Sequence, residues 1–189
     1  GLDMDNEVKI LEVINELEKE HYITMVPTFL GAHAIPPEYA GNNGGYVRLL
    51  LDKLIPYVGK RHLAKFSDVF CERGYFDPHE SETILNEAKK YGMQLKVHAD
   101  ELSSSGGAEL ASRVGAISAD HLEHVTEKGI DALKNAAVVA TLLPGVSFFL
   151  CHGYAPARKL IDASVPVALA SDFNPGSCMS FSMPLMMAI

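Results

Sequence analysis

Apolar residues recur along the chain at spacings that distinguish helices from strands. Near the start, Ile10, Ile14 and Leu17 stand three or four positions apart among Glu and Lys residues, which is typical of an amphipathic helix. Later apolar runs are short and rich in β-branched residues, as strands are. The predicted strands cover residues 23–30, 66–70, 94–98, 116–122, 137–143 and 165–171. The predicted helices after the first cover residues 46–57, 77–92, 106–114, 126–135 and 155–163.

Residues that start and stop helices support several of these boundaries. Asp77-Pro78-His79-Glu80 combines an N-cap residue, a first-turn proline and a carboxylate at the third helical position. Gly92 and Gly115 are suited to the left-handed conformation that ends a helix. Thr126 is a suitable N-cap for the helix that follows it.

Strands and helices therefore alternate, with roughly 25 residues in each repeat, and this favours parallel strands joined by helical crossovers. No linker or low-complexity segment interrupts the pattern, so a single α/β domain over residues 1–189 is expected. Five of the strands are well defined, fewer than the eight of a closed (β/α) barrel. The sheet is thus either open or part of an incomplete barrel.

Composition excludes several classes of partner. The net charge of -8, from 24 acidic and 16 basic residues, argues against a nucleic acid partner. No apolar run approaches the length of a membrane span, and no secretory leader opens the chain, so a cytoplasmic protein is expected. Cys71, Cys151 and Cys178 are an odd number without a paired motif, which predicts reduced and mostly buried thiols.

Polar side chains gather directly after four of the predicted strands. The segments are Gly31-Ala-His33-Ala, Val97-His98-Ala-Asp100-Glu101, Ser118-Ala-Asp120-His121-Leu-Glu-His124, and Ser171-Asp172-Phe-Asn174-Pro-Gly176-Ser177. In parallel α/β folds, sites assemble at the carboxyl ends of the strands. All four segments are expected to point toward one face.

Imidazole and carboxylate groups from different strands suit one divalent metal, zinc or iron, with a position left open for water. The metal lowers the pKa of that water, and a nearby base takes the proton. Asp172 is a carboxylate suited both to bind the metal and to hydrogen-bond to the water. Glu101, three residues beyond His98, can face the substrate, and His121 can polarise a carbonyl under attack.

Other polar residues have simpler interpretations. A histidine is more often structural or exposed than a ligand, and His21, His62 and His79 are interpreted in this way. The residues alone do not decide between His121 and His124. Cys151 follows the apolar continuation of a strand, and we expect its side chain to pack in the core. The role of His152 stays open.

Three further polar features stay open at this stage. Asp120 and Glu123 are interpreted as loop solvation or as groups behind the site. The 174–177 segment is either a plain turn or a set of backbone amides for an anion.

The strand-end segments together resemble the amidohydrolase superfamily and, within it, the imidazolonepropionase family. The residues that carry the resemblance are Thr28-Phe-Leu-Gly-Ala-His33-Ala-Ile-Pro-Pro-Glu-Tyr39, Val97-His98-Ala-Asp-Glu101, Ser118-Ala-Asp-His121-Leu-Glu-His124, Thr141-Leu-Leu-Pro-Gly145 and Ser171-Asp172-Phe-Asn174-Pro-Gly176-Ser177. The resemblance implies a (β/α)8 TIM-type barrel, of which this chain would hold the later strands. It also implies hydrolysis of 4-imidazolone-5-propanoate to N-formimidoyl-L-glutamate, in histidine degradation.

The resemblance assigns roles to single residues. His98 and Asp172 would be metal ligands, and His121 would be the catalytic histidine beside the bound water. Glu101 would contact the imidazolone ring, and His33 would bind substrate. The positions that would hold the product are Asn174, Gly176 and Ser177. A small-molecule substrate is implied, and a homodimer is an open alternative.

One departure from the family pattern is that its first-strand His-x-His pair has no counterpart in this chain. We therefore expect an internal portion of a longer enzyme, which alone would bind metal weakly and would not open the ring. Two rival hypotheses stay open. One is an aromatic-ring aminohydrolase of the same superfamily, and the other is a non-catalytic α/β module.

Overall fold

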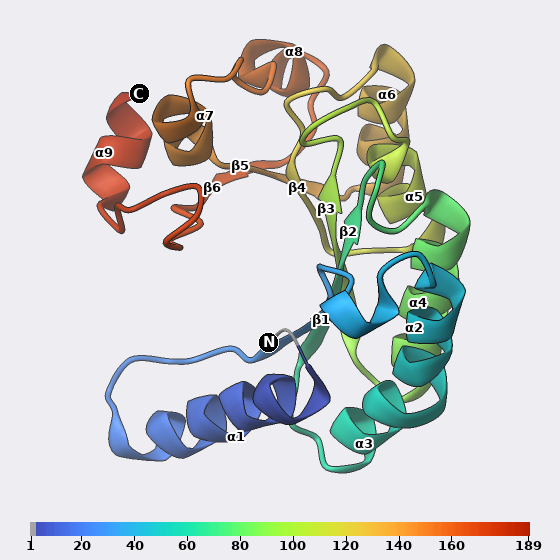
Figure 1. Ribbon diagram of the computed structural model, residues 1–189. Coiled ribbons are helices and arrows are strands. Elements are labelled where there is room, and N and C mark those ends of the chain that lie inside the picture. The colour runs from blue at the N-terminus through green and yellow to red at the C-terminus, as the bar shows by residue number, and fades with distance from the viewer. Residues whose placement is uncertain (1–2) are drawn as a thin grey trace. The chain divides into compact units, whose positions relative to one another are not determined.

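The computed structural model describes residues 3–189, which group into two compact units. The first unit ends at Lys96 and the second begins at Val97. Parallel strands alternate with helices in both units, as Figure 1 shows, and the strand order follows the chain from β1 to β6. The α/β class predicted from the sequence is confirmed. The single domain over residues 1–189 stays a prediction.

The first unit contains helices α1 to α4 and the first strands. Its elements are α1 (Met4–Glu20), β1 (Thr28–Ala32), the 3-10 turn η1 (Pro37–Tyr39), α2 (Asn43–Leu49), the π-helical turn η2 (Leu50–Leu54), α3 (Ile55–Lys60), β2 (Phe66–Cys71) and α4 (Pro78–Lys90). Strand β3 (Gln94–Ala99) crosses the boundary between the units. The pairing of Thr28 with Phe66 sets the parallel register of β1 and β2.

Strand β1 begins later than the apolar pattern predicts. The prediction of a strand from residue 23 was wrong, because Ile23 and Val26 are exposed and the ladder starts only at Thr28. Just before it, the carbonyl of Pro27 accepts the backbone N–H of Lys65. The strand then runs on to Ala32, which brings His33 directly after its end.

Helix boundaries in the first unit follow the capping signals. Asp77 accepts hydrogen bonds from the backbone N–H groups of His79 and Glu80, and Glu80 accepts the N–H of Asp77. This reciprocal capping box starts α4 where the sequence predicted. Asn42 caps α2 through the N–H of Gly45, so the helical segment begins earlier than residue 46.

The second unit holds the remaining helices and strands. Its elements are α5 (Gly107–Val114), β4 (Ser118–His121), α6 (Glu127–Ala136), β5 (Val139–Leu142), α7 (Pro144–Leu150), α8 (Ala157–Asp162), β6 (Val167–Leu169) and α9 (Met183–Ala188). Strand β5 pairs in parallel with both β4 and β6. Helices α5 and α6 pack side by side (Figure 1).

Helices α7 and α9 in this unit were not predicted from the sequence. Residues 144–150 form α7 rather than a strand continuation, because Pro144 occupies the first helical turn and suits that position. The helix ends at Cys151, which has a positive φ of 55° and is exposed, so the predicted packing of Cys151 was wrong. Cys71 and Cys178 are buried free thiols, as expected.

Side chains on both faces of β2 and β4 are buried, as is typical of parallel sheets covered by helices. Phe29, Val69 and Leu95 lie in the core of the first unit, and Ala119 and Ala140 in that of the second. No helix within residues 3–189 has the length and apolar character that a membrane span requires. The buried core residues hold the strands in place. The polar segments lie at the carboxyl ends of these strands.

Candidate active site

The ends of β3 and β4 bring two histidines together in the second unit. His98 is the penultimate residue of β3, and His121 is the last residue of β4. Their ring centroids are 5.1 Å apart, with 41° between the ring planes. His98 is half-buried, whereas His121 is only 1% exposed. The sequence predicted that these strand ends would converge, and they do.

His121 lies between two carboxylates. Its Nε2 is 3.4 Å from Oε2 of Glu101, and its Nδ1 is 3.9 Å from Oε2 of Glu123. Each ring nitrogen therefore has an acidic oxygen near it, and a protonated imidazole would be stabilised from both sides. A buried histidine between two acids is suited to move protons near neutral pH.

The backbone at the end of β4 is strained. His121 has a φ of 80° and Leu122 a φ of 71°, a region that residues with a Cβ seldom occupy. Such conformations cost about 1–3 kcal/mol each and cluster at functional sites. These two positive φ values turn the chain out of the strand at His121, the residue that lies between Glu101 and Glu123.

The loop that carries Glu101 is held in place by its neighbour Asp100. The carboxylate of this buried residue accepts hydrogen bonds from the backbone N–H groups of residues 105, 106, 107 and 108, and from the hydroxyl of Ser105. Asp100 thereby caps the start of α5 from outside the helix. The anchored loop fixes the backbone next to Glu101.

Backbone hydrogen bonds also join the ends of β3 and β4. Leu122 donates its N–H to the carbonyl of Ala99 at 3.0 Å, and His124 donates to the carbonyl of Asp100 at 2.8 Å. The hydroxyl of Ser104 donates to the carbonyl of His124. These bonds hold the two loops in register, so that Glu101 and His121 face each other.

The two candidate histidines on β4 have different surroundings. His121 is buried between acids, whereas His124, beyond the end of β4, is exposed and lines a cavity of about 300 Å³. His152, Leu102 and Glu101 line the same cavity. Burial favours His121 for proton transfer, which the sequence pattern alone did not decide.

Asp120 and Glu123, which the sequence left as loop solvation or as groups behind the site, both have buried side chains. Asp120 is buried, and one of its carboxylate oxygens lies within 4.8 Å of a ring nitrogen of His98. Of the two interpretations left open by the sequence, burial therefore opposes loop solvation and favours groups behind the site. The sequence does not show whether a polar residue at a strand end is buried, because its burial depends on how the neighbouring loops pack over it.

The Glu123 carboxyl has a perturbed acidity. Its pKa is raised from an ordinary 4.5 to about 7, mainly by burial and in smaller part by the negative charges of Glu101 and Asp172. Its own backbone N–H and the hydroxyl of Ser147, 3.3 Å from its Oε1, act in the opposite direction. Near neutral pH, Glu123 is therefore able to hold or release a proton.

The 172–177 segment after β6 forms a hydrogen-bonded turn. The amide of Asn174 donates to the carbonyl of Asp172 and the hydroxyl of Ser177, and its Oδ1 accepts the N–H groups of Gly176 and Ser177. Asp172 is half-buried with a φ of 49°. The turn interpretation thus has direct support, while the predicted contacts with a ligand remain predictions.

His33 lies in the first unit, directly after β1. Its ring stacks on that of Phe70, with 5.2 Å between the centroids and 17° between the planes. The side chain is half-buried. This stacking holds the imidazole in a fixed orientation at the carboxyl end of its strand.

Curated proteins of known name match the chain over its full length. It is 52% identical over 188 residues to the imidazolonepropionase of Thermoanaerobacter pseudethanolicus, covering all of this chain and 45% of that protein. It is 50% and 49% identical to the imidazolonepropionases of Geobacillus thermodenitrificans and Parabacteroides distasonis, again over 45% of each. Over its whole length the chain is similar to imidazolonepropionases. It spans less than half the length of these relatives. No family model matches the chain.

Solved structures confirm the fold that the imidazolonepropionase resemblance implied. A guanine deaminase from C. acetobutylicum matches 99% of the chain with a TM-score of 0.71, and the match covers 48% of that protein. An adenosine deaminase from Xanthomonas campestris, with bound Zn, matches 93% of the chain and 43% of that protein with a TM-score of 0.61. Both are 18% identical, which is evidence of fold alone. The chain therefore has the fold of about half of each deaminase, as a partial (β/α) barrel would.

Proposed function

We propose that this chain supplies part of the active site of an imidazolonepropionase, which hydrolyses 4-imidazolone-5-propanoate to N-formimidoyl-L-glutamate. The observation that carries the proposal is the buried His121 between Glu101 and Glu123, beside His98, in a chain about half identical to imidazolonepropionases throughout. The reaction adds water to the ring carbonyl, breaks the adjacent C–N bond and gives the leaving nitrogen a proton.

The donor set beside His121 fits a divalent metal. His98 offers an imidazole nitrogen within 4.8 Å of an Asp120 oxygen, and imidazole with carboxylate is a donor combination that zinc and iron accept. We assign His98 and Asp172 as ligands, with Asp120 behind His98 to orient its ring. A bound zinc or iron would lower the pKa of a water molecule and make it a nucleophile at neutral pH.

His121 and Glu101 perform the proton transfers in this proposal. The His121 imidazole donates a hydrogen bond to the carbonyl oxygen under attack, and Glu123 stabilises its protonated form through Nδ1. Glu101 contacts the imidazolone ring and passes a proton toward the leaving nitrogen. Asp172 accepts a hydrogen bond from the attacking water.

Four further residues are assigned to substrate binding. His33 would donate to a polar group of the substrate from its stacked position on Phe70. Asn174, Gly176 and Ser177 would hold the propanoate-derived end, which becomes the glutamate portion of the product. We also place the enzyme in the cytoplasm, because free Cys71 and Cys178 suit a reducing compartment.

A chimeric enzyme tests the function. This chain would replace the matching segment of the Thermoanaerobacter pseudethanolicus imidazolonepropionase, and loss of imidazolone propanoate would be followed by ultraviolet absorbance. The proposal predicts ring opening at a rate within about tenfold of the parent enzyme, because half of the aligned residues are already shared.

The chimera also separates the rival hypotheses. Ammonia release from guanine, without loss of imidazolone propanoate, would favour an aromatic-ring aminohydrolase. A folded chimera with neither activity would support a non-catalytic module. A His79→Ala chimera is the matched control, because His79 is exposed on α4 and should leave the rate unchanged.

A further inference from the structure

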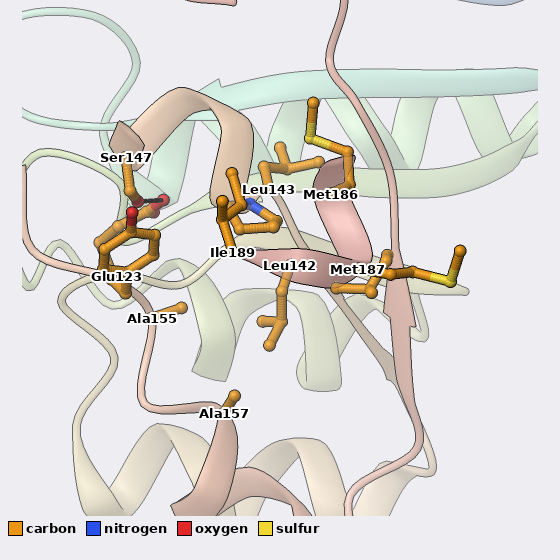
Figure 2. A pocket seen from close by; sticks show the side chains of 12 residues that line it. Glu123, Leu142, Leu143, Ser147, Ala155, Ala157, Met186, Met187 and Ile189 are labelled. Carbon is orange, nitrogen blue, oxygen red and sulfur yellow. Dashed lines mark hydrogen bonds between the residues drawn. The ribbon is translucent and has the colours of Figure 1, made fainter. Parts of the chain in front are cut away.

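Helix α7 carries a buried hydroxyl group that contacts one of the two acids beside His121. The hydroxyl belongs to Ser147, near the start of the helix, which is only 2% exposed. It donates a hydrogen bond to Oε1 of Glu123 at 3.3 Å, as the dashed line in Figure 2 marks. Within residues 3–189, no other side chain donates a hydrogen bond to Glu123. The bond therefore ties the segment after β4 to the helix after β5.

The two oxygens of the Glu123 carboxylate have different neighbours. Oε1 accepts the hydroxyl of Ser147, whereas Oε2 is buried and lies 3.9 Å from Nδ1 of His121. The whole side chain is 6% exposed, so water offers it few alternative donors. The bond to Ser147 thus determines which carboxylate oxygen faces the imidazole.

The start of α7 is packed closely enough to present this hydroxyl at a fixed position. A Cβ added to Gly145 would lie 2.6 Å from the sulfur of Met186 and 2.8 Å from that of Cys178, so only glycine fits there. The carbonyl of Ser147 also accepts the backbone N–H of His152 at 3.0 Å. Ser147 is therefore held by its own helix and does not depend on Glu123 for its place.

We propose that Ser147 is a positioning residue for the hydrolysis, an inference that rests on the function proposed above. Its hydroxyl holds Glu123 with Oε2 toward Nδ1 of His121, and this fixes the imidazole with Nε2 toward Glu101. Ser147 acts through Glu123 and touches no reacting atom. Its effect is largest in the transition state, where the His121 ring carries the most positive charge.

The steady-state constants of the chimeric enzyme test this role. Ser147→Ala should lower kcat by about tenfold and leave KM within about twofold, because the lost bond aligns a catalytic pair and not the bound substrate. Ser147→Thr keeps the hydroxyl and should retain kcat within about threefold. The added methyl group has room, since Ser147 lines a cavity of about 260 Å³ (Figure 2). Ser112→Ala is the control, because that hydroxyl donates only to the carbonyl of Ala108 in its own helix.

A double-mutant cycle separates positioning from a general structural defect. In a Glu123→Gln chimera the group that Ser147 aligns has lost its charge, so adding Ser147→Ala should change kcat by less than about twofold. A defect in folding or packing would instead lower kcat equally in both backgrounds. Such an equal loss would overturn the proposal, and so would an unchanged kcat in the Ser147→Ala chimera or no recovery in a folded Ser147→Thr chimera.

Nuclear magnetic resonance of the histidine ring nitrogens tests the same contact without turnover. The signals of His121 are those that disappear in the His121→Asn chimera. Ser147→Ala should shift them, because the Glu123 oxygen near Nδ1 is no longer held in place, whereas Ser112→Ala should not. A chimera that opened no ring would contradict the proposed function, and these spectra would still decide the role of Ser147. Unshifted His121 signals in a folded Ser147→Ala chimera would overturn it.

Discussion

At the scale of single residues, His121 and Glu123 form the buried acid–base pair of the proposed site. His121 lies at the strained end of β4, and Glu123 follows it on the same turn with a side chain that is almost fully buried. The two groups are 3.9 Å apart, so the charge of one depends on that of the other. The raised pKa of Glu123 can be measured through the pH dependence of the chain's stability.

Glu123 makes stability depend on pH. Its pKa is raised to about 7 when folded, so the folded chain holds a proton that the unfolded chain releases above 4.5. The resulting stability is complete below pH 4.5 and is lost as pH rises through about 7. Relative to the unaltered chain, Glu123→Gln should be up to about 3 kcal/mol more stable at about pH 8 and nearly equal at about pH 4.

Urea unfolding of both chains at the two pH values measures this difference. Glu127→Gln is the control, since Glu127 is exposed on α6 and should show the same pH dependence as the unaltered chain. An equal or lower stability of Glu123→Gln at the higher pH would mean that burial does not disfavour the charged carboxylate.

The sequence was sufficient to predict that polar residues at the ends of β3 and β4 would lie close together. His98, Glu101 and His121 were chosen from the sequence, and the structure brings these three together. The burial of Asp120 and Glu123 was not predictable, because it depends on loops that lie far apart in the sequence. Three-residue spacing likewise did not separate His121, which is buried, from His124, which is exposed.

At the scale of elements, the loop after β3 is fixed by Asp100. Asp100→Asn keeps the left-handed backbone, which asparagine tolerates, but replaces one acceptor oxygen with a donor opposite the N–H of Ala108. We expect a loss of about 2 kcal/mol in unfolding free energy. Amide hydrogen exchange should accelerate at residues 105–108, whose N–H groups bond to this carboxylate.

Asp131→Asn serves as the matched control, because it makes the same chemical change at an exposed helical position. If Asp100→Asn left both stability and amide exchange unaltered, Asp100 would not be what holds the Glu101 loop.

The capping box of α4 gives an independent element-scale prediction. Asp77→Ala removes the acceptor for the N–H groups of His79 and Glu80 and should cost about 1 kcal/mol. Asp77→Asn should retain most of that stability, because asparagine caps helices nearly as well. Thermal unfolding of the two variants compares them, and equal losses would show that the side-chain cap is not the cause.

Helix boundaries marked by capping residues were predicted better than element boundaries that depend on tertiary contacts. The start of α4, the end of α5 at Gly115 and the cap at Thr126 all follow from side chains within the segment. Helix α7 was missed because its apolar run matches a buried strand as well as a buried helix. Strand β1 was displaced because Ile23 and Val26 have the composition of a strand but no neighbouring strand to pair with.

At the scale of the whole molecule, alternation of strands and helices was sufficient to predict the α/β class. The (β/α) barrel followed from strand-end motifs and agrees with the fold of the deaminases. The chain length and the alternation of strands with helices did not by themselves distinguish an open sheet from a partial barrel. The motifs decided between them because their residue types and order are specific to the superfamily.

We propose that His121, not its neighbour His124, moves protons in imidazolone ring hydrolysis. The most direct test is kcat/KM of the chimeric enzyme carrying either His121→Asn or His124→Asn. The account predicts a loss of about 100-fold to 10,000-fold for His121→Asn, the range that a general acid–base group contributes. His124→Asn should stay within about threefold of the chimera, because that side chain is exposed outside the acidic pair. A larger loss for His124→Asn than for His121→Asn would contradict the account.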